Sequence, residues 1–369
     1  MSEPLIKMHD LSRKTALFRS ELEHAVGTVL DSGWYVLGQA GQRFESAFAE
    51  AVGVKYAIGV ASGTDAIELA LRALGIQSGD LVATVANAGA YTTTALLAIG
   101  AIPYYMDVQI TTHHPNFDEV LKAVKVNVKA VVLTHLYGSA VQEIQQMKNL
   151  CKKHGVPLLE DCAQAHGAKI DGRYVGSFGD VASFSFYPTK NLGAFGDGGM
   201  VTTSQENISK RLLQLRQYGW DSKYKIGLHG GRNSRLDEIQ AAILMVFLPH
   251  LHTDNERRRQ IAQRYSTQIV HPWISVPQCL NDSFVAHLYV IQTSRRDELQ
   301  KYLMAHGIAS DIHYPVADHQ QKIMLGSCSS VHLPATEELA GRVLSLPCYP
   351  ELRDEEIARV ISTLRAWGS

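Results

Sequence analysis

The sequence predicts an α/β protein with a mostly parallel central sheet flanked by helices, followed by a smaller α+β domain. Between about residues 55 and 205, short apolar strands alternate with helical patterns, which is typical of a parallel sheet covered on both faces. After about residue 270 this alternation stops. A chain of 369 residues is long enough for two domains. We expect a large domain at residues 1–250, including an N-terminal helical segment, and a smaller one at 251–369.

The expected strands of the large domain are short and apolar. They lie at residues 56–61, 81–85, 102–106, 130–133, 157–160, 181–185 and 200–203. The first helix is expected at residues 64–74, where apolar side chains recur at helical spacing and Gly75 follows as a C-terminal cap. Further helices are predicted at residues 91–99 and 141–154.

The second half of the chain has a different pattern. Apolar residues at helical spacing predict helices at 208–215 and 236–247, and residues 253–265, rich in Arg and Gln, are expected to link the domains. The predicted C-terminal domain contains a strand at 284–293 and helices at 296–306 and 354–364.

Composition excludes several classes of protein. The hydrophobic content of 46% and charged content of 19% are those of a soluble globular protein, and the net charge of −1 argues against a broad basic surface for nucleic acid. No apolar stretch is long enough to cross a membrane, and no signal-peptide pattern opens the chain. The cysteines are scattered and odd in number, which predicts reduced thiols and a cytoplasmic location. They are Cys151, Cys162, Cys279, Cys328 and Cys348.

Lys190 stands between an alternating, aromatic-rich strand and a glycine-rich turn at residues 193–199. A lysine ammonium is costly to bury unless something pairs with it. An amine held at this kind of junction can form a Schiff base with a cofactor aldehyde or with a ketone. A solvated turn lysine is the alternative, and this window alone does not separate the two.

Asp161 ends an apolar strand, where a carboxylate points into the crevice in which open α/β sheets bind ligands. It can pair with a protonated pyridine nitrogen, or it can cap a local turn. Gln164 and His166 follow within one turn and can hydrogen-bond a ring substituent. The spacing of 29 residues between Asp161 and Lys190 leaves room for one hairpin and one strand.

Two further segments fit the same cofactor. Residues 62–65 stand at a strand-to-helix junction, where free N–H groups and the helix dipole suit a phosphate. An ordinary helix N-cap explains the same residues and is the more common case. Tyr91 can stack on a flat ring or can be a core aromatic. Together the four segments supply a phosphate site, a stacking ring, a pyridinium partner and a Schiff-base amine.

With these motifs, the chain resembles the DegT/StrS type of sugar-nucleotide aminotransferases, which use pyridoxal 5′-phosphate (PLP). The resemblance covers nearly the whole chain and rests on residues 32–38, 160–168, 183–193 and 231–242. It implies PLP fold type I, as in aspartate aminotransferase, with PLP or its pyridoxamine form (PMP) as cofactor. It also implies a part in deoxyamino sugar biosynthesis, as for O-antigen or S-layer glycans.

The resemblance assigns roles to particular residues. Lys190 matches the Schiff-base lysine, Asp161 the partner of the pyridine nitrogen, and Gln164 the neighbour of the ring hydroxyl. The matched phosphate contacts and the stacking aromatic are Gly63, Thr64, Ser185 and Tyr91. Asn233 matches a residue that reaches the phosphate of the neighbouring subunit, which implies an obligate homodimer with shared active sites. Relatives with histidine in place of the lysine work as dehydratases, which Lys190 argues against.

Residues 313–321 resemble the His-Tyr-Pro-x-Pro-x-His-x-Gln pattern of members that aminate C-3 of a keto sugar, although Ala317 replaces the second proline. The expected reaction is the ping-pong conversion of a dTDP-3-keto-6-deoxyhexose to the dTDP-3-amino-3,6-dideoxyhexose, with L-glutamate as amino donor. The expected substrate contacts are Tyr187, Tyr218, His313 and Tyr314. A C-4 keto sugar, or a UDP-linked one, is the close alternative, and a PLP-fold sensor or scaffold without turnover is the distant one.

No resident metal is expected. Three histidines in the first half of the chain, His113, His114 and His135, have no ligand partner at helical or hairpin spacing. We therefore interpret them as surface or core histidines.

Overall fold

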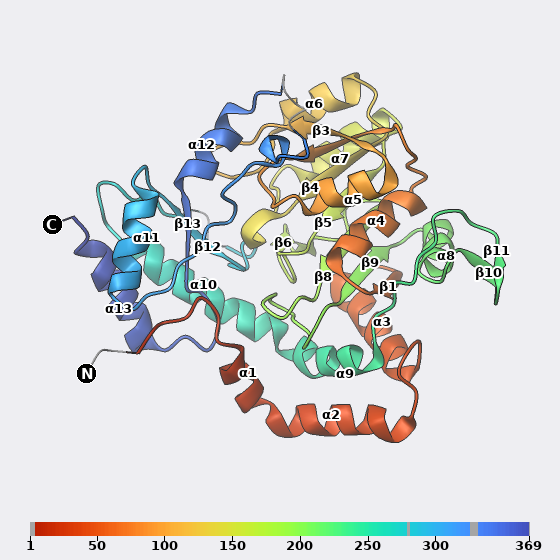
Figure 1. Cartoon of the computed structure of the whole chain (residues 1–369), viewed down its shortest axis with the longest axis horizontal. Coiled ribbons are helices and arrows are strands. Elements are labelled where there is room, and N and C mark those ends of the chain that lie inside the picture. The colour runs from red at the N-terminus through yellow and green to blue at the C-terminus, as the bar shows by residue number, and fades with distance from the viewer. Residues whose placement is uncertain (1–3, 279–280, 325–330, 369) are drawn as a thin grey trace.

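The computed structural model describes residues 4–278, 281–324 and 331–368. Its centre is a seven-stranded sheet in the order β1-β9-β8-β5-β4-β2-β3 (Figure 1). The strands are β1 (Tyr56–Val60), β2 (Leu81–Val85), β3 (Ile102–Met106), β4 (Ala130–Thr134), β5 (Leu158–Asp161), β8 (Val181–Ser185) and β9 (Gly199–Thr203). Only β9 runs antiparallel to its neighbours in this sheet, so the predicted mostly parallel sheet is confirmed.

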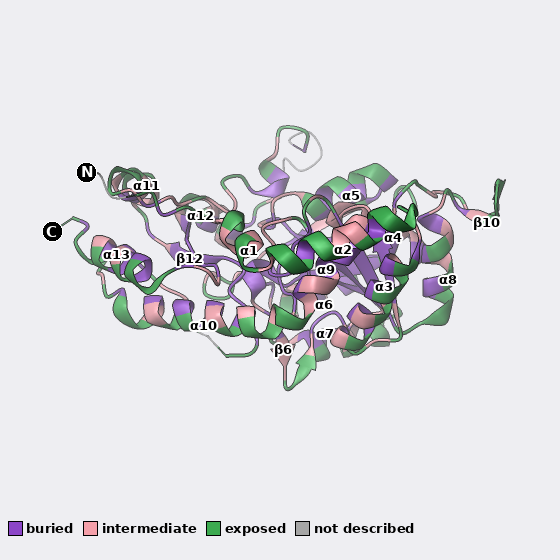
Figure 2. Ribbon diagram, turned by 90° about the horizontal axis from the view of Figure 1, so that it is seen from below, coloured by how far each residue is buried: buried purple, intermediate pink, exposed green. Residues whose placement is uncertain are grey.

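Helices cover both faces of the sheet because successive strand residues point to opposite sides. In β4, Ala130 and Val132 pack with one helix layer, whereas Val131 and Leu133 pack with the other. The first layer contains α4 (Gly63–Ala73), α5 (Tyr91–Ile99) and α8 (Glu206–Leu215). The second contains α3 (Gln39–Val52), α6 (Phe117–Lys125), α7 (Ile144–Lys153) and α9 (Glu238–Phe247). Figure 2 shows the buried sheet enclosed between helices that expose their outer faces.

The N-terminal segment is helical, as expected. It forms α1 (Leu11–Leu17) and α2 (Arg19–Ser32), and α2 packs against α9. The residues before α1 lie elsewhere: Ile6 is 2% exposed and belongs to the apolar core of the C-terminal elements. The chain therefore starts in the smaller part of the molecule before it enters the larger one.

The C-terminal elements form a second core. They are α10 (Leu251–Gln268), β12 (Tyr289–Gln292), α11 (Arg296–Ala305), α12 (Pro334–Arg342), β13 (Val343–Leu346) and α13 (Asp354–Arg365). The expected link at 253–265 is thus a continuous helix. Within the strand expected at 284–293, a continuous ladder forms only over the four residues of β12, while Phe284 makes an isolated bridge to Ser139. The domain boundary at residue 250 stays a prediction.

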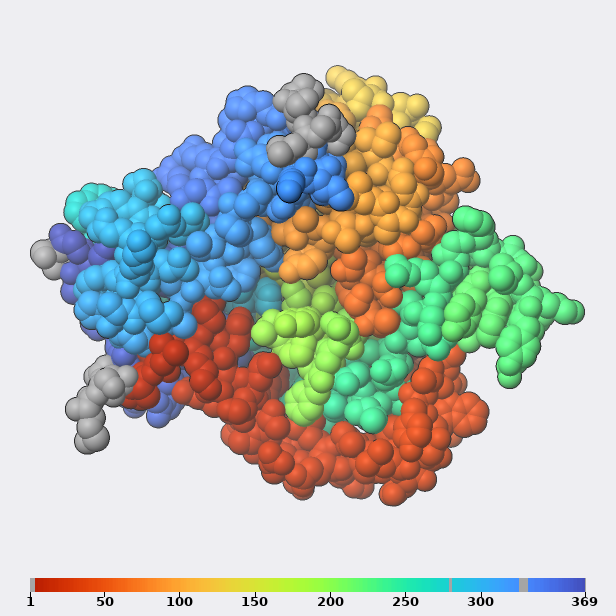
Figure 3. All heavy atoms as spheres, in the orientation of Figure 1, coloured from red at the N-terminus to blue at the C-terminus, as the bar shows by residue number. Residues whose placement is uncertain are grey.

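Two hairpins interrupt the regular layers, and sequence periodicity did not predict them. The strands β6 (Lys169–Ile170) and β7 (Arg173–Tyr174) form one between β5 and β8, in the space that the Asp161–Lys190 spacing allows. The other, β10 (Trp220–Ser222) with β11 (Lys225–Ile226), projects from the body of the molecule (Figures 1 and 3). We call residues 217–235 the arm. Strands of two or three residues are too short to show an alternating pattern.

Cysteines and membrane spans complete the description. Within the described residues, Cys151, Cys162 and Cys348 are free and buried, while Cys279 and Cys328 lie outside them. No helix in the described part of the chain has the length and apolarity needed to cross a bilayer.

Candidate active site

A cavity of about 440 Å³ lies at the carboxyl ends of β4, β5 and β8, which contribute Thr134, Asp161 and Ser185 to its wall. Parallel α/β sheets bind ligands at this edge. Most of the residues singled out from the sequence line it: Gly63, Thr64, Tyr91, Asp161, Gln164, Ser185, Tyr187, Lys190, His313 and Tyr314. The fold therefore brings the four sequence segments together in one place.

Lys190 reaches this cavity from the turn that follows β8. Its backbone N–H donates to the carbonyl of Tyr187 at 2.8 Å. The turn needs Gly193, because a Cβ there would lie 2.4 Å from the carbonyl oxygen of Pro188. Burial lowers the pKa of Lys190 from 10.5 to about 8, against the opposing effect of the Asp161 carboxylate. Nζ has no hydrogen-bond partner among the described residues, and the lowered pKa makes the neutral, nucleophilic amine more accessible near neutral pH than in an ordinary lysine.

Asp161 faces Lys190 from the end of β5. Its Oδ1 accepts from the N–H of Ala163 at 3.1 Å, and its Oδ2 accepts from the hydroxyl of Thr134 at 3.4 Å. Burial raises the pKa of Asp161, while the Ala163 N–H and the Lys190 charge act in the opposite direction. A carboxylate can accept about four hydrogen bonds, so this one keeps acceptor capacity for a protonated ring nitrogen.

The N-terminus of α4 forms the opposite end of the cavity. Ser62 caps this helix, since its Oγ accepts from the N–H of Asp65 at 3.1 Å, so the capping interpretation is right for Ser62. The N–H groups of Gly63 and Thr64 have no acceptor among the described residues. A Cβ at Gly63 would lie 2.6 Å from the Cβ of Ser185, so only glycine allows β8 to approach this closely. Two free N–H groups beside a serine hydroxyl suit a phosphate.

Gln164, Tyr314 and Tyr91 form the wall between these ends. The side-chain oxygen of Gln164 accepts from the N–H of Tyr137 at 2.6 Å, and its Nε2 donates to the Tyr314 hydroxyl at 3.0 Å. The rings of Tyr91 and Tyr314 meet edge to face at 6.1 Å. His313 is held from behind, because its carbonyl accepts from the Tyr137 hydroxyl and its Nδ1 contacts Ser345 Oγ at 2.8 Å.

These groups fit PLP. The phosphate has the α4 N-terminus, the ring nitrogen has Asp161, and the aldehyde has the unpartnered amine of Lys190. In each case the protein leaves the group free to bind a ligand: the N–H groups at the α4 N-terminus, the remaining acceptor positions of Asp161 and the amine of Lys190. Their roles toward the cofactor are still predictions.

Two predicted residues do not join the cavity of their own chain. Asn233 and Tyr218 lie at the base of the arm, where the backbones of Gln217 and Asn233 pair. Tyr218 is 39% exposed and packs on Trp220. Arg216, which precedes the arm, is buried; its Nη1 donates to Glu45 Oε1 at 2.5 Å.

Sequence reasoning missed two histidines of the cavity, His9 and His287. His9 precedes α1, and burial together with nearby cations lowers its pKa to about 3. His287 precedes β12 and is 4% exposed, and burial, followed by the Lys190 charge, holds its pKa well below 6.5. Both residues come from segments far from the other motifs, and a single histidine without a motif gives no local signal.

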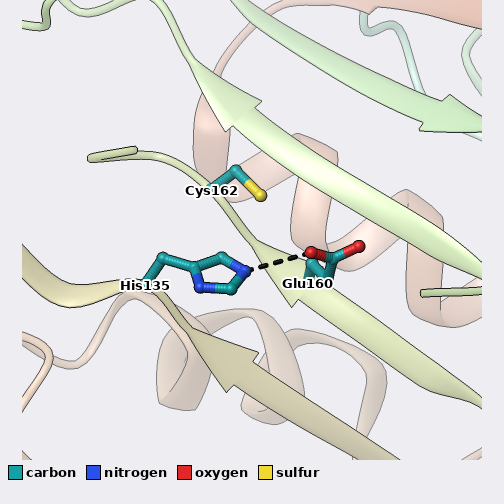
Figure 4. A group of neighbouring side chains, drawn as sticks. All are labelled: His135, Glu160 and Cys162. Carbon is teal, nitrogen blue, oxygen red and sulfur yellow. Dashed lines mark hydrogen bonds and ion pairs between the residues drawn. The ribbon is translucent and has the colours of Figure 1, made fainter. Parts of the chain in front are cut away.

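His135 directly follows β4, and Glu160 and Cys162 lie at the end of β5. The potential ligand atoms of these three residues lie within 4.8 Å of one another (Figure 4). His135, interpreted from the sequence as a surface or core histidine, is fully buried. Glu160 and Cys162 lie beside it because β4 and β5 are adjacent in space, not through helical or hairpin spacing. The group is nevertheless satisfied by protein. Val141 N–H donates to His135 Nδ1 at 3.0 Å, so Nε2 carries the proton that it donates to Glu160 at 3.1 Å. Burial raises the pKa of the Cys162 thiol well above 9, which disfavours a thiolate ligand.

Comparisons with known proteins agree with this geometry. The model of the DegT/DnrJ/EryC1/StrS aminotransferase family matches residues 17–365. A UDP-N-acetyl-3-dehydro-α-D-glucosamine 3-aminotransferase of Acidithiobacillus ferrooxidans is 42% identical over 98% of this chain and 97% of its own length. A dTDP-3-amino-3,6-dideoxy-α-D-galactopyranose transaminase of Aneurinibacillus thermoaerophilus is 40% identical over 99% and 100%. The crystal structure of S. venezuelae DesV in complex with a ketimine intermediate superposes with a TM-score of 0.94, at 39% identity and 99% coverage of both chains.

Proposed function

The chain belongs to the DegT/DnrJ/EryC1/StrS aminotransferase family of PLP-dependent sugar aminotransferases, and from this premise we propose that it aminates C-3 of a nucleotide-linked keto sugar with L-glutamate as donor. The observation that carries the proposal is the free amine of Lys190, facing Asp161 in one cavity with a pKa lowered to about 8. The preferred substrate is a dTDP-3-keto-6-deoxyhexose. The A. ferrooxidans relative supports a UDP-linked 3-keto sugar as the alternative.

PLP bound in this cavity supplies an aldehyde that condenses with amines and a ring that accepts the electrons of an adjacent carbanion. The chain would hold it at the phosphate through the N–H groups of Gly63 and Thr64 and through Ser185, while Tyr91 would stack on the ring and Gln164 would hydrogen-bond the ring hydroxyl. Asp161 would keep the ring nitrogen protonated. Nζ of Lys190 takes a proton from the reacting carbon and returns it, since an amine with a pKa of about 8 can do both near neutral pH.

The sugar enters beside Tyr187 and the His313–Tyr314 segment, which line the open side of the cavity. Tyr187 is 54% exposed, so its hydroxyl is available to a substrate. The nearby carbonyl, phenol and imidazole groups suit the hydroxyls of a hexose. The product is proposed to serve deoxyamino sugar biosynthesis, including O-antigen or S-layer glycans.

The active site is proposed to be shared across a homodimer, with the arm of one subunit bringing Asn233 and Tyr218 to the cavity of its partner. The exposure of large apolar residues on the arm and at the α2–α3 corner supports this, since such patches mark protein interfaces. Tyr224 and Ile226 are 76% and 73% exposed, and Trp34 is 64% exposed. The buried free thiols support a cytoplasmic location.

Mixing subunits tests the shared site. Lys190→Ala and Asn233→Ala homodimers should each be impaired. In a heterodimer of the two variants, one site combines the intact Lys190 of one subunit with the intact Asn233 of the other, so one of its two sites works. Random mixing makes about half of the dimers heterodimers, and activity should therefore return to about a quarter of wild type. If Asn233 serves its own subunit, mixing restores nothing.

The function itself is tested with PLP-loaded protein. L-Glutamate should bleach the visible absorption band and form 2-oxoglutarate, and a 3-keto nucleotide sugar should then restore the band. Parallel incubations with dTDP-3-keto, UDP-3-keto and dTDP-4-keto sugars, followed by NMR of the products, identify the aminated carbon and the preferred nucleotide. Amination at C-4 would overturn the C-3 assignment. A visible absorption band that L-glutamate leaves unchanged would favour a sensor or scaffold.

A further inference from the structure

His287 lies at the end of a hydrogen-bond chain that begins one residue after the active-site lysine. Asn191 follows Lys190 and is 2% exposed; its Nδ2 donates to the backbone carbonyl of Val285 at 2.9 Å and to Asn255 Oδ1 at 2.7 Å. Nδ2 of Asn255 in turn donates to the carbonyl of His166 at 2.8 Å. All of these groups are buried, so each must keep its partner.

Backbone carbonyls fix the orientation of both amides. A carbonyl only accepts, so the atom of Asn191 that faces Val285 must be its NH₂ group, and the same holds for Asn255 facing His166. The remaining atom of Asn191 is therefore its oxygen, which lies 3.1 Å from Nδ1 of His287. An oxygen acceptor at this distance requires a proton on Nδ1.

The amide chain thus fixes the tautomer of His287. With the proton on Nδ1, Nε2 carries a lone pair and can only accept a hydrogen bond. The titratable groups that act on His287 from other elements are Lys190, Arg258, His9 and His166, each a cation or a possible proton donor. Because these groups are cations or donors, they favour a neutral His287 ring whose Nε2 accepts a hydrogen bond.

Lys190 carries a hydrogen-bond donor that lacks an acceptor. It lines the same cavity as His287, and its Nζ has no hydrogen-bond partner among the described residues. Resting on the proposed function, we propose that His287 is a positioning residue for Lys190, whose free ammonium donates to His287 Nε2 between proton transfers. The contact holds Nζ in place while the amine is not bound to the cofactor.

Two substitutions separate this role from a merely structural one. His287→Asn keeps a donor near the position of Nδ1, and so the bond to Asn191, but removes the acceptor at Nε2. His287→Gln places an amide near Nε2 and gives up the bond to Asn191. Each variant is loaded with pyridoxamine phosphate, which leaves the Lys190 amine free. Acetylation of Lys190 is then followed against pH by mass spectrometry, and thermal unfolding reports the fold.

An acceptor stabilises the ammonium, so its loss should lower the pKa of Lys190. For a shift of about one unit, Lys190 of His287→Asn should be acetylated about fivefold faster at pH 7 than wild type, at a similar unfolding temperature. His287→Gln should label like wild type but unfold at a lower temperature. Unchanged labelling in His287→Asn would overturn the inference; if that variant does not fold, altered labelling in His287→Gln would overturn it.

The labelling reads the amine itself and needs no turnover. If L-glutamate leaves the absorption band of the wild type unchanged, the proposed function is refuted. The role of His287 is decided separately, by the rates at which Lys190 is acetylated in the wild type and in the two variants. The two failures are therefore distinguishable.

Discussion

Glu160, the buried neighbour of Asp161, holds four hydrogen-bond donors at once. Its Oε1 accepts from the N–H groups of Phe178 at 2.7 Å and Gly179 at 2.6 Å, and its Oε2 accepts from Gly176 N–H at 2.8 Å and His135 Nε2 at 3.1 Å. Glu160→Gln replaces one oxygen with an NH₂ group. Each oxygen accepts two of the four hydrogen bonds. Whichever oxygen becomes the NH₂ group, two of the four donors therefore lose their acceptor and face another donor.

The expected cost follows from that count. A buried donor without an acceptor costs about 1–3 kcal/mol, so two of them should lower the free energy of unfolding by about 2–6 kcal/mol. His135 cannot relieve this by moving its proton, because Nδ1 already accepts from Val141 N–H. Since Asp161 directly follows Glu160, the variant should also bind PLP more weakly.

Urea denaturation followed by circular dichroism measures the effect, and PLP titration measures the cofactor affinity. Glu50→Gln, an exposed position with the same change of charge, is the matched control and should unfold like wild type. If Glu160→Gln unfolds at the wild-type urea concentration, the hydrogen-bond account of this group is wrong. If a chelator lowers the stability of the wild type, a metal bound by His135, Glu160 and Cys162 explains the group better.

Two further predictions concern Lys190 and the buried carboxyl of Asp318. Lys190→Ala should abolish turnover and the visible band while circular dichroism and size exclusion stay unchanged; multiple turnovers in this variant would refute Lys190 as the proton carrier. Asp318 accepts from Ala90 N–H at 2.9 Å and from Thr93 Oγ1 at 2.7 Å, and burial raises its pKa from 3.8 to about 6. Its protonation therefore favours the folded state below about pH 4, and this contribution is lost as the pH rises through about 6. Against Asp318→Asn, wild type should lose up to about 3 kcal/mol of stability over this range, and a pH-independent difference would contradict the assignment.

The sheet and most of its helices were predictable because each element carries its own signal. Buried strands such as β4 are apolar except at their last residue, and α4 shows helical spacing between a capping serine and Gly75. The arm and the β6–β7 hairpin carry no periodic signal, since their strands are only two or three residues long. The spacing between Asp161 and Lys190 left room for a hairpin but did not place its strands. The pairing of β12 over only four residues also depends on β13, a partner more than fifty positions away.

The sequence by itself was enough to predict the chemistry of the site. Lys190 precedes a glycine turn and Asp161 ends an apolar strand, and local backbone geometry suffices to place such residues at the edge of a sheet. The tertiary structure alone decided which other groups meet them. His9 and His287 enter from opposite ends of the chain, and the tautomer of His287 depends on amides fixed by distant carbonyls. These features arise from long-range packing and hydrogen bonding, which no local pattern of residues encodes.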